Sequence, residues 1–142
     1  MKAIGPIPPG FETAKNGALE VGGRKVDALV DEAGGTPLFV YDFSRIEEKI
    51  ARFRTAMPEA VKLHYAVKAN PYEPLLRRLA TRVDGFDLAS GGELAALEEA
   101  GGLALPVSFA GPGKRNEELA LAIKRGVTIN LESEGEAARA LG

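Results

Sequence analysis

The chain has 142 residues, which is enough for about one small domain with a buried core. Eighteen Lys and Arg against twenty Asp and Glu leave a formal net charge of −2, without long runs of one sign. This balance disfavours nucleic acid and membrane surfaces as partners. With no cysteine the chain forms no disulfide and no thiolate metal site, which fits a cytoplasmic location, and we single out no metal ligands. We expect neither a signal peptide nor a membrane span, because no apolar run is long enough.

The first part of the chain predicts short, separate elements. Residues 1–18 are rich in Pro and Gly and indicate an extended arm. Residues 19–26 resemble a short strand and turn, with Gly22-Gly23 in the middle. Residues 26–33 have apolar side chains at helical spacing, and Gly34-Gly35 follow them, so we expect a short amphipathic helix there.

A repeating pattern occupies the rest of the chain. Strand-like runs begin near Leu38, Lys62, Gly85, Val107 and Val127, in steps of 24, 23, 22 and 20 residues, with a helical pattern in each gap. This spacing predicts about five successive βα units and therefore an α/β fold with a parallel sheet. A complete (β/α)8 barrel needs eight strands and about 250 residues, so we expect the amino-terminal portion of a longer barrel protein.

Three serines mark the predicted helix starts. Each is followed three residues later by a glutamate, in the capping-box pattern, and the pairs are Ser44 with Glu47, Ser90 with Glu93, and Ser133 with Glu136. The helices that follow carry apolar stripes, which we expect to pack on the outside of the sheet.

The run from Leu63 to Asn70 has the period-two alternation of a strand. It places Leu63, Tyr65 and Val67 on one face and Lys62, His64, Ala66 and Lys68 on the other. Lys68 falls at the carboxyl end, where α/β proteins place their chemistry, although a strand-end lysine alone is more often a solvated charge. The same alternation puts polar groups on the inner face of the later strands, namely Asp87, Asn130 and Glu132.

Three motifs carry a family resemblance. Tyr65-Ala66-Val67-Lys68-Ala69-Asn70, the run from Gly85 to Leu94, and the run from Phe109 to Lys114 occur in the order and approximate spacing of the fold type III pyridoxal-phosphate decarboxylases. This family has the alanine-racemase type of barrel and includes the diaminopimelate, ornithine and arginine decarboxylases. With Pro8-Pro9-Gly10-Phe11, the chain most resembles the exosortase-associated pyridoxal-dependent decarboxylase branch.

The resemblance implies a cofactor and the residues that hold it. Pyridoxal 5'-phosphate provides a sink for the electrons left by a departing carboxylate. Lys68 is implied as the lysine that holds the cofactor as a Schiff base, and the small Ala66 leaves room for the ring. Asp87 falls at the family's aspartate position in the next strand. The alternative for Asp87 is an ion pair that only keeps Lys68 charged.

Two other features favour structural interpretations. His64 lies four residues before Lys68 on the same face, about 13 Å away along a strand, so we interpret it as structural. The run Gly111-Pro112-Gly113-Lys114 lacks the full P-loop pattern and is more often a plain βα turn than a phosphate cradle.

The predicted function is therefore decarboxylation of a basic or diamino amino acid in the full-length protein. The resemblance implies a homodimer, with residues 1–25 joining a second β domain and residues 26–142 forming the truncated cofactor-binding barrel. Other parts of the family's site lie beyond Gly142, so we expect the 142-residue chain alone to be inactive. Alternatives are an amino-acid racemase of the same fold, a non-catalytic relative that binds the cofactor, or a barrel module with a structural Lys68. Lys68-Ala69-Asn70-Pro71-Tyr72 departs from the racemase pattern and favours decarboxylase.

Overall fold

The computed structural model describes residues 17–142, which divide into two compact units between Ala56 and Met57. The motif from Pro8 to Phe11 and most of the predicted arm lie outside the described residues. Among residues 17–142, no helix combines the length and the apolar character that crossing a bilayer requires.

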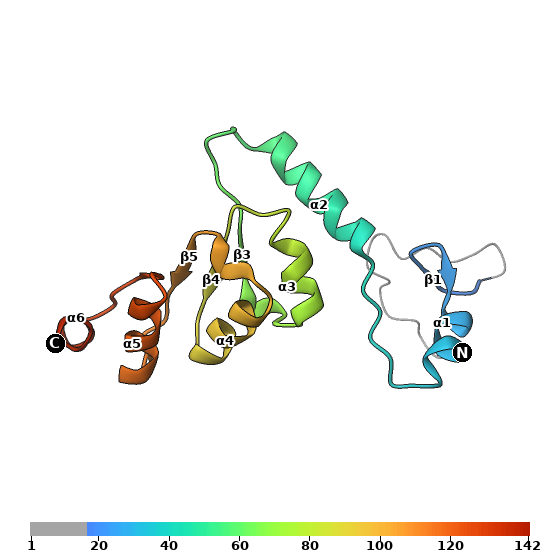
Figure 1. Cartoon of the computed structure of the whole chain (residues 1–142). Coiled ribbons are helices and arrows are strands. Elements are labelled where there is room, and N and C mark those ends of the chain that lie inside the picture. The colour runs from blue at the N-terminus through green and yellow to red at the C-terminus, as the bar shows by residue number, and fades with distance from the viewer. Residues whose placement is uncertain (1–16) are drawn as a thin grey trace, which may run out of the picture. The chain divides into compact units, whose positions relative to one another are not determined.

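The first unit begins with a small hairpin followed directly by a helix (Figure 1). Strand β1 (Glu20–Val21) pairs antiparallel with β2 (Arg24–Lys25), and the connecting glycines both have positive φ, at 59° and 74°. Helix α1 (Val26–Ala33) ends at Gly34, whose φ of 78° is the left-handed conformation that terminates many helices. The predicted strand and turn, helix and helix stop are confirmed, and the structure adds the pairing of a second strand.

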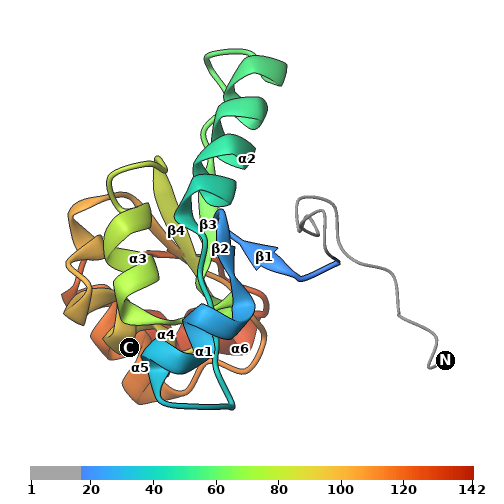
Figure 2. The ribbon, with the colours of Figure 1, turned by 90° about the vertical axis from the view of Figure 1, so that its right-hand side faces the viewer.

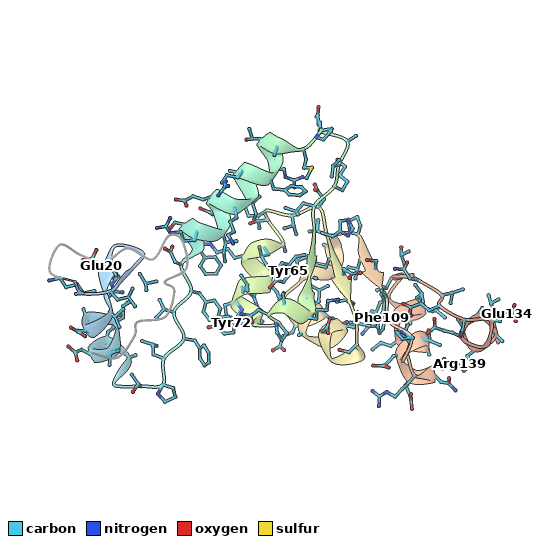
Figure 3. All side chains as sticks on the ribbon, turned by 180° about the vertical axis from the view of Figure 1, so that it is seen from behind. Glu20, Tyr65, Tyr72, Phe109, Glu134 and Arg139 are labelled. Atoms are coloured by element: carbon cyan, nitrogen blue, oxygen red, sulfur yellow. The ribbon has the colours of Figure 1, made fainter. Side chains whose placement is uncertain are left out.

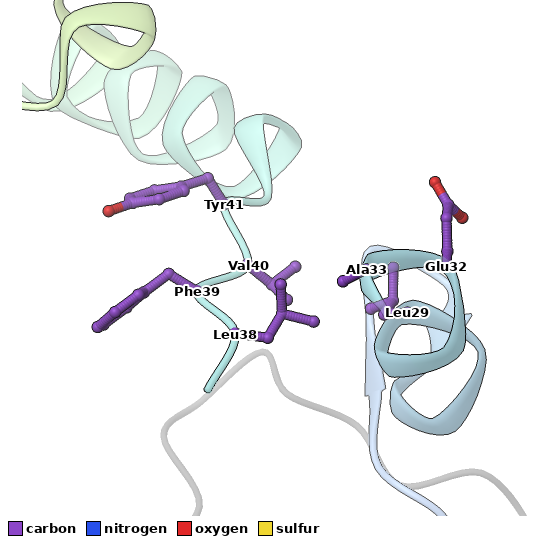
Figure 4. A pocket seen from close by; sticks show the side chains of 7 residues that line it. All are labelled: Leu29, Glu32, Ala33, Leu38, Phe39, Val40 and Tyr41. Atoms are coloured by element: carbon purple, nitrogen blue, oxygen red, sulfur yellow. The ribbon is translucent and has the colours of Figure 1, made fainter. Parts of the chain in front are cut away.

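The strand predicted to begin near Leu38 is not part of a sheet. Between α1 and α2 (Phe43–Ala56) no residue is assigned to a strand, and Phe39 is 85% exposed. A run becomes a strand only if a neighbouring backbone accepts its hydrogen bonds, and the sheet described in this unit contains β1 and β2 alone. This segment instead forms one wall of an apolar hollow (Figure 4), lined by Leu29, Glu32, Ala33, Leu38, Phe39, Val40 and Tyr41.

Helix α2 starts one residue earlier than its predicted cap. Because the helix begins at Phe43, Asp42 precedes it, and Asp42 Oδ1 accepts hydrogen bonds from Ser44 N at 3.0 Å and Ser44 Oγ at 2.6 Å. Asp42 therefore takes the capping role predicted for Ser44, since a carboxylate can accept from two donors at once. The hydrogen bond from Ser44 lowers the pKa of Asp42.

The second unit is a four-stranded parallel sheet with the strand order β3-β4-β5-β6. The strands are β3 (His64–Ala66), β4 (Gly85–Leu88), β5 (Val107–Phe109) and β6 (Thr128–Ile129). The connecting helices are α3 (Glu73–Leu79), α4 (Gly91–Glu99) and α5 (Asn116–Lys124), and α6 (Glu134–Leu141) follows the last strand. Short 3-10 turns occupy Val67–Ala69 and Gly102–Ala104.

The helices lie along one face of this sheet, each in contact with the next (Figures 1 and 2). Alternate strand residues point into the layer between sheet and helices, where Phe86, Leu88 and Phe109 are fully buried (Figure 3 labels Phe109). Apolar residues of α3, α4 and α5 fill the other side of this layer, among them Leu75, Leu76, Leu79, Leu94, Leu97 and Leu119. The predicted α/β class and the predicted helix faces are confirmed.

Two of the three predicted capping boxes form in this unit. Ser90 Oγ accepts from Glu93 N at 3.2 Å, and Ser133 Oγ accepts from Glu136 N at 3.0 Å. Each glutamate reaches back one residue beyond the cap: Glu93 accepts from Ala89 N, and Glu136 from Glu132 N, both at 2.9 Å. The serine and glutamate therefore fix the strand end as well as the helix start.

Candidate active site

A row of four residues crosses the face of the sheet that points away from the helices. The strand register pairs Ala66 with Asp87, Asp87 with Ser108, and Ser108 with Thr128. Side chains at paired positions of parallel strands share a face, and these alternate with core residues such as Phe86. We call these four residues the inner row. The inner row places Ala66 and Asp87 side by side and adds two hydroxyl groups.

Lys68 lies just after β3, in the 3-10 turn Val67–Ala69, and its side chain is exposed. The expectation of a continuous strand from Leu63 to Asn70 is therefore wrong beyond Ala66. The strand stops early because Asn70 bonds locally: its N–H donates to Val67 O and its Oδ1 accepts from Tyr72 N, both at 3.0 Å. Lys68 nevertheless remains at the carboxyl end of β3, two residues beyond the inner-row Ala66.

Tyr65 holds the chain on the two sides of Lys68. Its hydroxyl donates to Asn70 O at 3.3 Å, and its ring meets Phe86 edge-on with 6.3 Å between the ring centroids. Val67, next to the lysine, is fully buried. The backbone that carries Lys68 is therefore anchored before, beside and after it, while the amine itself extends into solvent.

Asp87 is bound by Ser108 rather than by Lys68. Ser108 Oγ donates to Asp87 Oδ1 at 2.8 Å, and both side chains are half-buried. No ion pair joins Lys68 to Asp87 in the part of the chain that the structure describes. Sequence reasoning missed Ser108, although Val107-Ser108-Phe109 repeats the apolar-polar-apolar pattern of Phe86-Asp87-Leu88 and could have indicated it.

His64 lies at the amino end of β3, away from Lys68, and is exposed. Its ring occupies the space beside Gly85 on the paired strand, where an added Cβ would come within 2.5 Å of His64 Cε1. His64 thus has a packing contact at the end of β3 opposite to Lys68.

Donors of the turn Gly111-Pro112-Gly113-Lys114 are bonded to other groups of the protein. Gly111 N donates to a Glu132 carboxylate oxygen, and Lys114 Nζ donates to Gly111 O at 2.7 Å and Asn130 O at 2.8 Å. Lys114 is 3% exposed and also pairs with the buried Glu136 at 3.2 Å. The interpretation as a βα turn, and not a phosphate cradle, is supported, and Glu132 is engaged in that turn.

Carboxylates bridge neighbouring turns at this end of the sheet. Glu118 Oε1 accepts from Gly91 N at 2.7 Å, and its Oε2 accepts from Arg115 N at 2.8 Å. These hydrogen bonds, first that of Arg115 N and then that of Gly91 N, lower the pKa of Glu118. The hydrogen bond from Glu132 N, followed by the interaction with Lys114, likewise lowers the pKa of Glu136.

A parallel βα sheet with a lysine and a polar row at its carboxyl ends defines part of a barrel-type enzyme domain. Residues 43–140 match the family described as "Pyridoxal-dependent decarboxylase, pyridoxal binding domain". The chain belongs to this family, whose cofactor is pyridoxal 5'-phosphate. The fold type III assignment is thereby confirmed.

Relatives and solved structures agree with this family. The diaminopimelate decarboxylase of Neisseria meningitidis serogroup A is 43% identical over 104 residues, which are 72% of this chain and 26% of the relative. A Staphylococcus aureus 2-[(L-alanin-3-ylcarbamoyl)methyl]-2-hydroxybutanedioate decarboxylase is 35% identical over 71% of this chain and 25% of its own. The crystal structure of the M. jannaschii diaminopimelate decarboxylase in co-complex with L-lysine matches with a TM-score of 0.80 and 28% identity, over 92% of this chain and 31% of that one. This chain therefore spans about a quarter to a third of these relatives.

The residues present fit the aldehyde side of the cofactor. A primary amine that binds an aldehyde must be accessible, and Lys68 is exposed at the carboxyl end of β3. Ala66 has a small side chain on the same strand, and Asp87 with Ser108 provides polar groups on the neighbouring strands. The turn at Gly111 offers no free cradle for the phosphate, because its amide is bonded to Glu132.

Proposed function

We propose that this chain forms the cofactor-binding part of a pyridoxal-phosphate-dependent amino-acid decarboxylase, with Lys68 as the residue that holds the cofactor. One observation carries the proposal. Lys68 lies within the family-matched range 43–140 and is an exposed amine at a strand end beside the inner row. Ala66 and Asp87 are the proposed cofactor contacts, since they lie on the inner face next to that strand end.

The chain's residues divide the work in this proposal. When bound, the cofactor supplies the electron sink that makes loss of a carboxylate feasible. Lys68 provides the amine that attaches the cofactor and exchanges with the substrate's amine. Tyr65 donates a hydrogen bond to Asn70 O and thereby holds the turn that contains Lys68. The small side chain of Ala66 would allow the cofactor ring to approach this strand. Asp87 offers a carboxylate oxygen that accepts a hydrogen bond from a bound group.

The finer parts of the function are also proposals. We propose a basic or diamino amino acid as substrate, because the Neisseria relative is named for diaminopimelate and the M. jannaschii structure contains L-lysine. The Staphylococcus relative is named for a different amino acid, so the substrate needs direct measurement. A cytoplasmic homodimer, the exosortase-associated branch, and the division at residues 1–25 and 26–142 rest on the sequence resemblance.

The first experiment locates the cofactor on the protein. The full-length protein is mixed with pyridoxal phosphate, reduced with borohydride and digested, and the modified lysine is identified by peptide mass. We expect the label on Lys68, and loss of the visible absorption band in K68A. The control is K62A, because Lys62 is an exposed lysine just before the same strand and should keep the band.

The two kinds of result decide between clear alternatives. Label on Lys68 together with carbon dioxide release supports the decarboxylase, and a chirality assay on the same sample separates it from a racemase. Label on other surface lysines but not on Lys68 would end the proposal and leave Lys68 as a structural residue.

A further inference from the structure

We propose that Ser108 is a positioning residue that fixes the Asp87 carboxylate in the candidate active site. Its hydroxyl holds one carboxylate oxygen, so that the second oxygen remains for a hydrogen-bond donor of the cofactor bound at Lys68. This inference rests on the proposed function and adds to it a residue outside the motifs that carry the family resemblance.

The hydrogen bond has one direction. An ionised carboxylate only accepts hydrogen bonds, so the Ser108 hydroxyl must donate. It lies 2.8 Å from Asp87 Oδ1 but 3.5 Å from the alternative acceptor, Phe86 O. The shorter contact is the usual length for a hydroxyl donor, while the longer one is at the outer limit. The Ser108 hydroxyl therefore donates its hydrogen bond to Asp87.

The register makes this contact possible at small entropic cost. Ser108 and Asp87 are directly paired on neighbouring strands, and strands lie about 5 Å apart, so two short side chains can meet. Short side chains lose little rotamer freedom when they are held. The pair is therefore a fixed unit of the sheet surface, in contrast to the exposed Lys68.

Asp87 has spare capacity to bind something else. Within residues 17–142 its one hydrogen-bond partner is Ser108, and it takes part in no ion pair. Aspartate is disfavoured inside strands, and this one lies half-buried on the inner row beside Ala66. A carboxylate with one oxygen fixed and the other available suits a protonated nitrogen or N–H of a bound molecule.

A matched pair of variants tests the role of the hydroxyl. S108T keeps the hydroxyl and S108V replaces it with a methyl group of similar shape, and both are β-branched residues that strands favour. In the full-length protein we expect S108V to weaken pyridoxal phosphate binding about tenfold, and S108T to stay within about twofold of the wild type, because one hydrogen bond to a charged group is lost only in S108V.

The readouts separate positioning from mere stability. The dissociation constant is measured by adding pyridoxal phosphate and following the visible absorption band. The band is also followed as a function of pH, and the midpoint of that pH curve should shift in S108V but not in S108T. Melting temperatures should agree between the two variants. If S108V does not fold, S108A replaces it as the smaller variant without a hydroxyl.

Each outcome has one meaning. Equal dissociation constants and equal pH midpoints for S108T and S108V would overturn the role of Ser108, even with Lys68 labelled in the wild type. Absence of label on Lys68 in the wild type would instead remove the proposed function, and with it this inference.

Discussion

Single carboxylates organise the turns at the carboxyl end of the sheet. Glu118 is a clear case, because its two oxygens accept from backbone N–H groups of two different turns, at Gly91 and Arg115. Helix starts leave N–H groups without partners, and a nearby negative charge satisfies them and complements the helix dipole. Each such glutamate therefore stabilises the fold only while it is ionised.

This dependence on ionisation predicts a pH effect at Glu118. Its folded-state pKa is lowered, so its contribution is present above its unfolded pKa and is lost as the pH falls through the lower folded value. We expect E118Q to melt below the wild type at neutral pH, and the difference to close as the pH falls through the lowered folded-state pKa of Glu118. Thermal melts from pH 7 downward measure it.

Glu117 provides the control for this prediction. It is the neighbouring residue in the first turn of α5, and its exposed side chain makes no hydrogen bond or ion pair with the described residues. E117Q changes the net charge equally but removes only a screened surface charge, so it should lower the melting temperature much less than E118Q does. A gap between E118Q and the wild type that is constant with pH would contradict the role of the charge.

At the scale of elements, Lys114 connects the last two βα units. Its amine donates to carbonyls at the ends of β5 and β6 and pairs with Glu136 on α6, all from a site that is 3% exposed. Arg139, also on α6, adds bonds to Lys114 O and Asn116 Oδ1 at 2.9 Å (Figure 3). The strand ladder between β5 and β6 is short, so these side chains hold much of that junction.

Removing this lysine should loosen the junction. We expect K114M to lower the melting temperature by about 5 °C or more, because it leaves the buried Glu136 without its partner. K124M, which removes an exposed lysine from the end of α5, should have little effect. Thermal melts of the purified proteins compare the two.

A double variant identifies the cause. Replacing a buried ion pair with apolar residues costs less than breaking it, so K114M/E136L should be more stable than K114M. A double variant less stable than both single variants would contradict this explanation.

At the scale of the whole molecule, the chain contains only part of a family member. It spans 26% of the Neisseria relative and 31% of the M. jannaschii structure. We expect the purified 142-residue chain to release no carbon dioxide from diaminopimelate, ornithine, arginine or lysine, because the four described parallel strands are half of the eight in a complete barrel. The full-length protein is the positive control, and release by the short chain would contradict the expectation.

Sequence patterns predicted the features that are set locally. The helix stop at Gly34, the caps at Ser90 and Ser133, and the alternation around Asp87 depend on neighbours along the chain. The errors arose where a residue's conformation depends on its hydrogen-bond partners in the folded structure. Leu38 starts no strand because no partner strand adjoins it, and Lys68 leaves the strand because Asn70 forms its own turn. Ser108 was missed because its importance comes from a residue on another strand.

The alternation along β4 and β5 assigns neighbouring residues to two different tasks, packing against the helices and lining the inner row. Phe86, Leu88 and Phe109 face the helices, whereas Asp87 and Ser108 between them face the inner row. A substitution on the inner row therefore changes what can bind without disturbing the packed layer behind it. In evolutionary terms, these strands can acquire a new specificity by exchanging every second residue while the fold is inherited unchanged.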